Sequence, residues 1–459
     1  MISFIKLNNF KSFKNVELDL RGKKGIPKKI AFIYGENGSG KTNLMDSLFF
    51  LHNSFNTLMN INLLTNIENK DLSNVIEENK YSKDDLISFI KKIANRPLDE
   101  LLAENKMIGS KDPMQIEIGF YLNKKEGRYL VEFNDLKVIK ESLFFTIRER
   151  IGEIFSISEK SINLNDSVFV DRKYKNELVE NVEKYWGKHT FMSILFNERK
   201  IKNKEYINEK LNPNLIRTMK LLNRCTVICK NNYSQKGYFA IPYSFLSNLK
   251  EGIFTKEFKK ELPVFEHFLN IFFTQLYSDI KKVFYKITVT EDNKERYELY
   301  LSKEMYNQVI DIPFKLESTG TQKLLEVVPA IISSLLGESV FIDEIDNGIH
   351  DQLMFEIVNL FKESLLDTET GQFIATTHNT LLLKQLEPEN IYLIVTDSFG
   401  NKEIQNLSDY SFRTQRNNNI QNKYLNGDYF GLPTVGYLDF TEMIEDLSTS
   451  LKPEKEFSV

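Results

Sequence analysis

The sequence predicts an α/β protein in which a mixed, largely parallel sheet is flanked by an antiparallel sheet and interrupted by a helical insertion. Three stretches support this prediction. Residues 29–44 read as a short apolar strand, a glycine-rich turn and the start of a helix. From residue 318 onward helical and strand patterns alternate, which favours a parallel sheet with helices on both faces. Residues 115–145 alternate apolar and polar side chains, as antiparallel strands do.

The composition is that of a folded protein with more than one domain. The chain has 459 residues, of which 41% are hydrophobic. A formal net charge of −4 gives no general attraction to nucleic acid, so such a partner is neither supported nor excluded. The N-terminus lacks a signal-peptide core, and the longest apolar run, Leu324 to Leu336, is too short to span a bilayer. We therefore expect a cytoplasmic protein without a membrane partner.

The chain divides into three predicted parts. Residues 1–147 form a first lobe, with a strand pair at 1–20 and a polar helical elaboration at 53–110. Residues 148–284 read as a helical insertion, in which Cys225 and Cys229 are expected to be reduced thiols on one helix face. Residues 285–459 form the second lobe. Its expected elements are strands at 285–310, 339–342, 372–375 and 391–395, and helices at 322–336 and 352–365.

The turn in the first lobe has the spacing of a phosphate-binding loop. Gly35, Gly40, Lys41 and Thr42 occupy the fixed positions of G-x-x-x-x-G-K-[ST]. Lys41 would reach the β and γ phosphates, and Thr42 would place its hydroxyl on Mg²⁺. The sequence therefore predicts that ATP binds with Mg²⁺ at the residues Gly35, Glu36, Asn37, Gly38, Ser39, Gly40, Lys41 and Thr42.

Two acidic residues follow a buried strand in the second lobe. Asp343 and Glu344 come directly after Val340, Phe341 and Ile342. Mg²⁺ prefers oxygen ligands, and a carboxylate can orient or deprotonate an attacking water. We expect Asp343 on the metal side and Glu344 as the catalytic base.

Two other segments have both a functional and a structural interpretation. His378 ends the next strand, where it could contact the γ-phosphate and the water as a second catalytic residue, or could be an ordinary surface histidine. Ser318 and Gly320 precede a helix whose N-terminal amides suit a phosphate. The alternative for that segment is a simple helix cap.

Together these motifs resemble the ATP-binding-cassette ATPases, and more narrowly the SMC-like heads. GENGSGKT resembles Walker A, ESTGTQK the signature motif, VFIDE Walker B, and His378 the switch histidine. Asn347 to His350 resemble the D-loop. The sequence departs from the family pattern in two places: transporter cassettes usually have Asp where His350 stands, and the signature reads STGT rather than SGGQ. The resemblance implies Mg²⁺-dependent ATP hydrolysis in a homodimer or higher oligomer, in which Ser318 and Gly320 act on the partner's nucleotide. Gln115 is the candidate for the Q-loop residue at the metal.

A narrower resemblance lies near the end of the chain. Residues 415–433, QRNNNIQNKYLNGDYFGLP, resemble the tail of prokaryotic ATPases of the abortive-infection AbiL and RloA type, which are related to the ATPase subunits of PARIS, Septu and OLD systems. The resemblance implies a sensor or scaffold in anti-phage defence. It also implies an effector, a nuclease or toxin encoded by a neighbouring gene, and a phage-derived trigger.

Other functions were weighed against this one. A DNA-clamping genome-maintenance ATPase is the main alternative, although the insertion between Glu141 and Lys315 lacks the heptads of a long coiled-coil arm. A transporter subunit would have Lys41 and Ser318 much closer together. A self-contained nuclease is disfavoured because little chain follows His378. The sequence does not identify the trigger or the effector.

Overall fold

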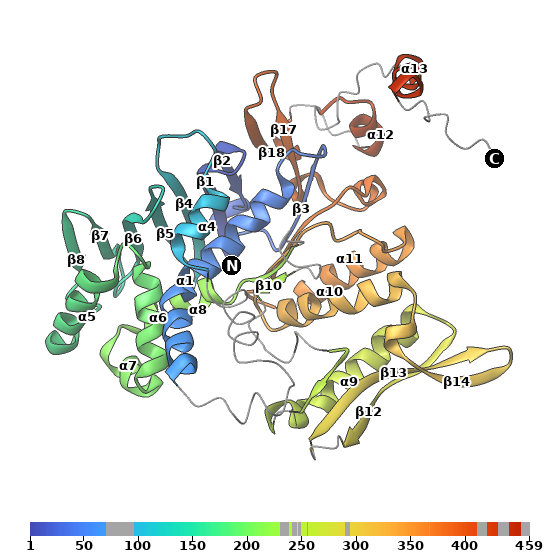
Figure 1. Cartoon of the computed structure of the whole chain (residues 1–459), viewed down its shortest axis with the longest axis horizontal. Helices are drawn as coiled ribbons and strands as arrows, with labels where there is room; N and C mark the ends of the chain where they lie inside the picture. The colour runs from blue at the N-terminus through green and yellow to red at the C-terminus, as the bar shows by residue number, and fades with distance from the viewer. Residues whose placement is uncertain are drawn as a thin grey trace, which may run out of the picture.

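The computed structural model describes residues 1–69, 96–229, 238–240, 246, 249–254, 256–289, 294–366, 368–410, 420–429 and 440–450. Residues 70–95 of the expected helical elaboration at 53–110, and residues 415–419 and 430–433 of the tail at 415–433, lie outside these residues. Within them, the chain is an α/β structure with a mixed central sheet and two antiparallel sheets (Figure 1). The predicted fold class is therefore confirmed.

The central sheet has the strand order β10-β9-β15-β16-β3-β17-β18. Its inner strands, β9 to β17 in that order, run parallel, and β10 and β18 pair antiparallel at the two edges. The strands predicted from the second lobe are all present. The bounds are β10 Tyr238–Ala240, β9 Thr226–Cys229, β15 Ser339–Ile342, β16 Gln372–Thr376, β3 Ile30–Gly35, β17 Ile391–Thr396 and β18 Lys402–Asn406.

Both faces of the central sheet are buried. In β3, Ala31 and Ile33 point into one core, whereas Phe32 and Tyr34 point into the other. Helix α1 (Lys41–Asn69) covers the first face, and α10 (Thr319–Leu335) and α11 (Asp351–Leu366) cover the second. Because side chains fill both faces, the strand ends and the loops after them are where a ligand can approach.

The larger antiparallel sheet has the order β2-β1-β4-β5-β6-β7-β8 and lies over α1 (Figure 1). The strand pair at 1–20 and the antiparallel strands within 115–145 are where the sequence predicts them. The last two strands fall in the segment expected to be helical, and this secondary-structure expectation was wrong there. The bounds are β1 Ile2–Phe10, β2 Phe13–Asp19, β4 Met114–Leu122, β5 Lys125–Phe133, β6 Val138–Thr146, β7 Ile151–Ser158 and β8 Ser161–Leu164.

The middle of the chain supplies helices and two short strands of the central sheet, β9 and β10. The helices are α4 Leu98–Asn105, α5 Arg172–Tyr185, α6 Phe191–Ile201, α7 Lys204–Lys210 and α8 Pro213–Asn223. Cys229 lies in β9 rather than in a helix, because residues 226–228 pair with β15. Cys225 and Cys229 are both buried free thiols, so their expected reduced state holds although the shared helix face does not.

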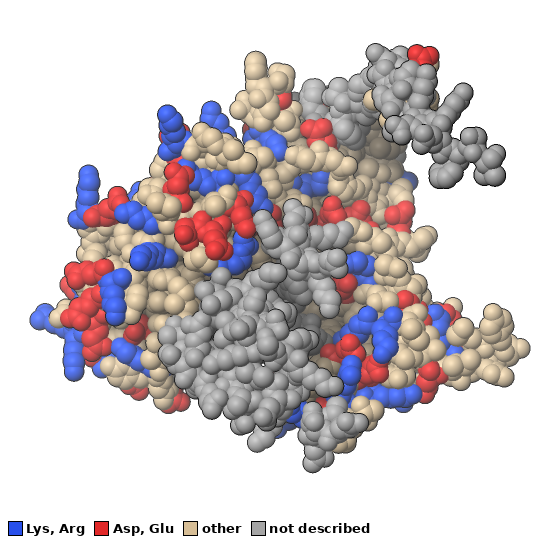
Figure 2. All heavy atoms as spheres, viewed as in Figure 1, with Lys and Arg blue, Asp and Glu red and all other residues tan. Residues whose placement is uncertain are grey.

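A small sheet with the order β11-β13-β12, with β14 paired to β13, packs against α9 (Lys256–Leu276). Its strands are β11 Glu251–Ile253, β12 Ile280–Val289, β13 Glu295–Met305 and β14 Gln308–Pro313, and helices α12 (Ile420–Leu425) and α13 (Phe440–Ser450) follow the central sheet. On the face in Figure 2, basic and acidic side chains intermingle. None of the described helices has both the length and the hydropathy of a membrane span.

Candidate functional site

The glycine-rich turn joins β3 to α1 at the carboxyl edge of the central sheet. Gly38 and Gly40 have φ angles of 82° and 111°, a region that residues with a Cβ rarely adopt. A Cβ built on Gly40 would lie 2.6 Å from the ring of Phe13, which comes from β2. The motif glycine at position 40 is therefore required by both the backbone and the packing.

Lys41 lies inside this loop. Its Nζ donates to the carbonyl oxygens of Gly35, at 2.8 Å, and Glu36, at 2.9 Å. Burial lowers the pKa of Lys41, and the nearby carboxylates, Asp343 first among them, oppose that effect. The lysine thus places a positive charge inside the loop, against two of its carbonyl oxygens.

The next residue, Thr42, connects the loop to the second lobe. Its hydroxyl donates to Asp343 Oδ2 at 2.8 Å, and the hydroxyl of Thr376 donates to Asp343 Oδ1 at 2.6 Å. Burial raises the pKa of Asp343, whereas the hydrogen bonds from Thr376 and Thr42 act in the opposite direction. Two residues predicted as metal ligands from distant parts of the sequence are therefore in direct contact.

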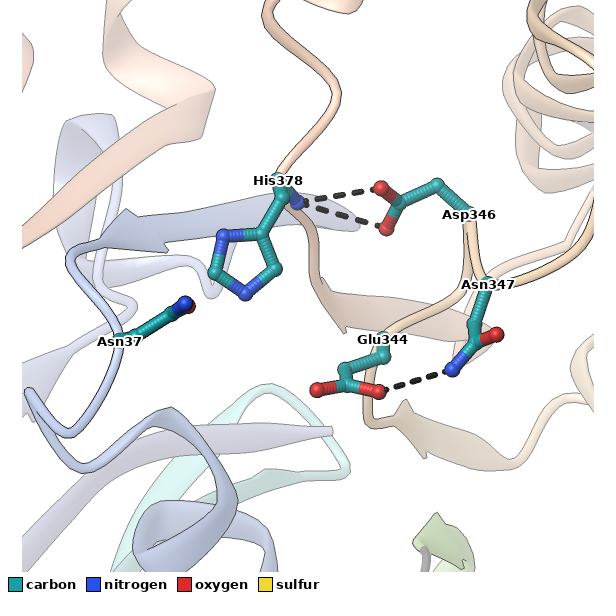
Figure 3. Close-up of a pocket in the computed structure, with 5 residues that line it drawn as sticks. All are labelled: Asn37, Glu344, Asp346, Asn347 and His378. Atoms are coloured by element: carbon teal, nitrogen blue, oxygen red, sulfur yellow. Dashed lines mark hydrogen bonds between the residues drawn. The ribbon is translucent and has the colours of Figure 1, made fainter. Parts of the chain in front are cut away.

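Glu344 follows Asp343 in an uncommon backbone conformation, with a φ of 47°. Its amide N–H donates to Thr376 Oγ1 at 2.7 Å, and its Oε2 accepts a hydrogen bond from Asn347 Nδ2 at 3.0 Å. The side chain is half-buried. Glu344 therefore has one carboxylate oxygen held by Asn347 and the other directed into the space that Asn37 and His378 border (Figure 3).

A pocket of about 510 Å³ opens beside these residues and is lined by Asn37, Glu344, Asp346, Asn347 and His378 (Figure 3). The backbone N–H of His378 donates to both oxygens of Asp346, at 3.4 and 3.3 Å. This contact leaves the imidazole over the pocket, between Asn37 and Glu344 in the view of Figure 3. The structure thus brings the phosphate loop, the predicted base and the predicted switch histidine to one opening.

Other predicted site residues lie outside this pocket. His350 directly precedes α11, and its Nδ1 accepts from the Gln352 amide at 3.2 Å. Gln115 accepts from Asn8 Nδ2 at 2.6 Å within the antiparallel sheet, and no contact among the described residues joins it to Thr42 or Asp343. The roles assigned to His350 and Gln115 stay predictions.

The signature-like segment has the geometry of a helix start. The Ser318 Oγ accepts from the Thr321 amide at 3.2 Å and caps α10, so the alternative of a helix cap is realised in the fold. Ser318 is exposed, and a Cβ on Gly320 would lie 3.0 Å from the carbonyl oxygen of Gly348. The segment is therefore packed beside the D-loop-like residues, with Ser318 exposed at the surface.

The residues present fit a nucleotide with Mg²⁺. The Ser39 hydroxyl is buried in the loop and has no hydrogen-bond partner among the described residues. A Cβ on Gly35 would lie 2.7 Å from that hydroxyl, so this position of the loop does not admit a side chain. Thr42 and Asp343 offer a hydroxyl and a carboxylate, the hard ligands that Mg²⁺ takes together with phosphate oxygens and water.

Two residues of the site were missed in the sequence. Asp346 lines the pocket. The sequence could have indicated it, because Asp346 is a third acidic residue only two positions after Glu344 in the run DEID. Thr376 contacts both predicted acidic residues. Its signal was a hydroxyl residue directly after the apolar run Phe373 to Ala375.

Comparison with known proteins gives the following similarities. The family model described as "AAA domain" matches residues 5–237, just over half of the chain. A second AAA domain model, whose description mentions the AbiEii toxin and Type IV TA systems, matches residues 244–384.

Two curated proteins are similar to parts of this chain. The "DNA replication and repair protein RecF" of Clostridium acetobutylicum is 25% identical over 269 residues, 54% of this chain and 62% of that protein. The "Chromosome partition protein Smc" of Methanocaldococcus jannaschii is 49% identical over 47 residues, 10% of this chain and 4% of that protein. The chain thus spans less than two thirds of the length of either relative.

Solved structures of SMC heads cover most of this chain at low similarity. The head bound to the C-winged helix domain of ScpA has 15% identity and a TM-score of 0.43, covering 88% of this chain and 96% of its own. The head domain from Thermotoga maritima has 12% identity and a TM-score of 0.37, covering 88% and 98%. Since the first AAA domain model extends over more than half of the residues and includes the phosphate loop, the chain belongs to the AAA domain family.

Proposed function

We propose that this chain is an SMC-like ATPase that binds ATP on residues 35–42 and hydrolyses it in the pocket beside Glu344 and His378. The observation that carries the proposal is the contact of Thr42 with Asp343, 2.8 Å apart, directly before Glu344, which lines that pocket. It brings a phosphate loop and an acidic strand end from two halves of the chain into one site. Membership of the AAA domain family supports the same reaction.

Each residue then has a definite task in hydrolysis. Lys41 and the loop amides offset the charge of the β and γ phosphates. Mg²⁺ held by Thr42 and Asp343 would supply further positive charge to those oxygens. Glu344 orients the water and accepts its proton, and His378 contacts the γ-phosphate from the other side of the pocket.

The site is completed in a dimer. Ser318 is exposed at the N-terminus of α10, which is 17 residues long, and it lies outside the pocket that its own chain forms. The amides of such a helix end attract an anion. In the proposed arrangement Ser318 and Gly320 contact the nucleotide bound on Lys41 of a second copy, so ATP holds two chains together.

The biological setting proposed is anti-phage defence of the AbiL or RloA kind. The chain would be the sensor or scaffold that controls an effector from a neighbouring gene, after a phage-derived trigger. Two findings support this: the description of the model on residues 244–384 mentions the AbiEii toxin, and residues 415–433 resemble the tail of these ATPases. The test is phage plating on cells that carry the chain with its neighbouring genes, in wild-type and Lys41→Ala form. Protection that is lost with Lys41→Ala supports the role, and protection by neither form contradicts it.

A DNA-maintenance ATPase is the second candidate, because the curated relatives are a DNA replication and repair protein and a chromosome partition protein. Salt-dependent binding of duplex DNA that increases with ATP would favour this candidate. For either setting, steady-state phosphate release with ATP and Mg²⁺ tests the enzymatic part. Absence of release from a folded, nucleotide-bound protein would contradict it.

A further inference from the structure

Thr376, the last residue of β16, is bonded to three consecutive residues of the loop after β15. Its hydroxyl donates to Asp343 Oδ1 at 2.6 Å and accepts the Glu344 amide N–H at 2.7 Å. Its carbonyl oxygen accepts the amide N–H of Ile345 at 3.1 Å. Thr376 itself is fully buried, with 0% of its surface exposed. One buried side chain therefore contacts both acidic residues of the site.

The direction of the Thr376 hydroxyl proton follows from these contacts. A hydroxyl has one proton and two lone pairs, and the Glu344 amide takes a lone pair. The proton is then free to point at Asp343 Oδ1, while Asp343 Oδ2 remains toward Thr42. A β-branched residue in a strand has few rotamers, so the hydroxyl has a fixed direction. The carboxylate of Asp343 is thereby oriented by a donor at each oxygen.

The same hydroxyl holds the backbone of Glu344. With a φ of 47°, this residue has a left-handed conformation that costs energy for a non-glycine residue and needs support from its surroundings. The bond from its amide to Thr376 Oγ1 gives that support. The parallel register explains the contact: Ala375 is opposite Ile342, so Thr376 lies beside the residues that follow Ile342.

We propose that Thr376 is a positioning residue that sets the orientation of Asp343 and Glu344 together, and so couples the metal ligand to the catalytic base. The inference rests on the proposed ATPase function of this site. A valine would keep the shape of Thr376 but place a methyl group against the Asp343 carboxylate and leave the Glu344 amide without its acceptor. A serine would keep the hydroxyl.

The test compares wild type with Thr376→Val and Thr376→Ser in the full chain. The matched control is Thr226→Val, a change at another fully buried strand threonine whose hydroxyl has no partner among the described residues. A fluorescent ATP analogue is titrated with and without Mg²⁺, which measures how much Mg²⁺ increases affinity. Phosphate release then gives kcat and KM, and thermal unfolding without nucleotide reports the fold.

Thr376→Val should bind the Mg²⁺-free analogue as wild type does, but should lose at least about tenfold of the Mg²⁺-dependent gain and of kcat, as expected when a buried charged group loses a donor. Thr376→Ser should restore both, and Thr226→Val should match wild type. If Thr376→Val does not fold, Thr376→Cys, with its weak donor, should show the same selective loss.

A wild-type Mg²⁺ gain in a folded Thr376→Val or Thr376→Cys variant would overturn the inference, as would a Thr376→Ser variant that loses as much as Thr376→Val. These outcomes differ from a failure of the proposed function. If wild type itself binds the analogue without Mg²⁺ dependence and releases no phosphate, the ATPase proposal fails. If wild type is active and the Thr376 variants equal it, only the role of Thr376 is lost.

Discussion

Glu344→Gln separates nucleotide binding from hydrolysis. The substitution keeps the size of the side chain, so the Asn347 Nδ2 can still donate to an oxygen at position 344, 3.0 Å away in the native site. The Glu344 backbone contact with Thr376 does not involve the carboxylate at all. What is lost is the ability of this carboxylate, which lines the pocket, to accept a proton (Figure 3).

The size of the effect follows from that loss. Removing a general base costs on the order of 10² to 10⁴ in rate, or about 3 to 5 kcal/mol in the barrier. We expect kcat to fall by that factor, ATP affinity to stay within a few-fold of wild type, and ATP-bound dimers to accumulate. Phosphate release at saturating ATP and size-exclusion chromatography with ATP measure these effects.

The control is Glu338→Gln, the same substitution at a buried glutamate just before the other end of β15. It should change kcat little, because Glu338 precedes the strand while Asp343 follows it. Wild-type turnover in Glu344→Gln would refute the assignment of the base and leave His378 as the residue that positions the water. A Glu338→Gln variant as slow as Glu344→Gln would show that the loss is not specific to the base.

Three further perturbations test separate parts of the account. Gly40→Ala should abolish ATP binding and lower the temperature midpoint of unfolding, because φ at Gly40 is 111° and a Cβ there would lie 2.6 Å from the Phe13 ring. Titration with ATP measures the binding, and scanning calorimetry measures the midpoint. An unchanged midpoint would contradict the packing argument. Mixing Lys41→Ala chains with Gly320→Asp chains should restore part of the ATPase activity that each variant lacks alone. In a mixed dimer, one of the two sites at the dimer interface contains both substitutions and the other contains neither. Mixed dimers without activity would count against sites that are formed by two chains. Burial raises the pKa of Glu141 from 4.5 to about 6, so the folded chain holds this proton more tightly than the unfolded chain does. This difference contributes about 2 kcal/mol to the free energy of unfolding below pH 4.5, and the contribution is lost as the pH rises to about 6. Urea unfolding at a series of pH values measures this pH dependence, which Glu141→Gln should remove. The same pH dependence in Glu141→Gln and wild type would refute the prediction.

The central strands were predictable because their burial is visible in the sequence. Residues 30–34 and 340–342 are continuous apolar runs, as strands covered on both faces must be. The phosphate loop was also predictable, because its glycines and lysine are required by the backbone shape of a few consecutive residues. Fold class and phosphate loop could therefore be inferred without tertiary information.

The strands inside the expected helical insertion could not be inferred so easily. β9 has only four residues, follows closely after α8, and becomes a strand through its pairing with the distant β15. In β7 the consecutive residues Ile154 and Phe155 are both buried, because a register shift against β6 interrupts the alternation there. A two-residue period is then hard to recognise.

The contacts of Thr376 depend on a parallel register between β15 and β16, which no local pattern specifies. For the same reason the sequence could nominate Asp343 and Glu344 but could not identify the residue that orients them. Contacts between the ends of strands that are distant in the sequence are therefore the part of the site that a single sequence predicts least well.

Calorimetric titration of ATP with Mg²⁺ into wild type, Lys41→Ala and Lys29→Ala tests whether the loop at residues 35–42 binds the nucleotide. Both lysines flank β3 and donate to two backbone carbonyls, Lys41 within the loop and Lys29 at the opposite end of the strand. Only Lys41 would meet the phosphates. We expect wild type and Lys29→Ala to bind ATP with similar affinity and Lys41→Ala to give no measurable binding, so that residues 35–42 are the nucleotide site. Equal affinity in all three proteins would contradict this expectation.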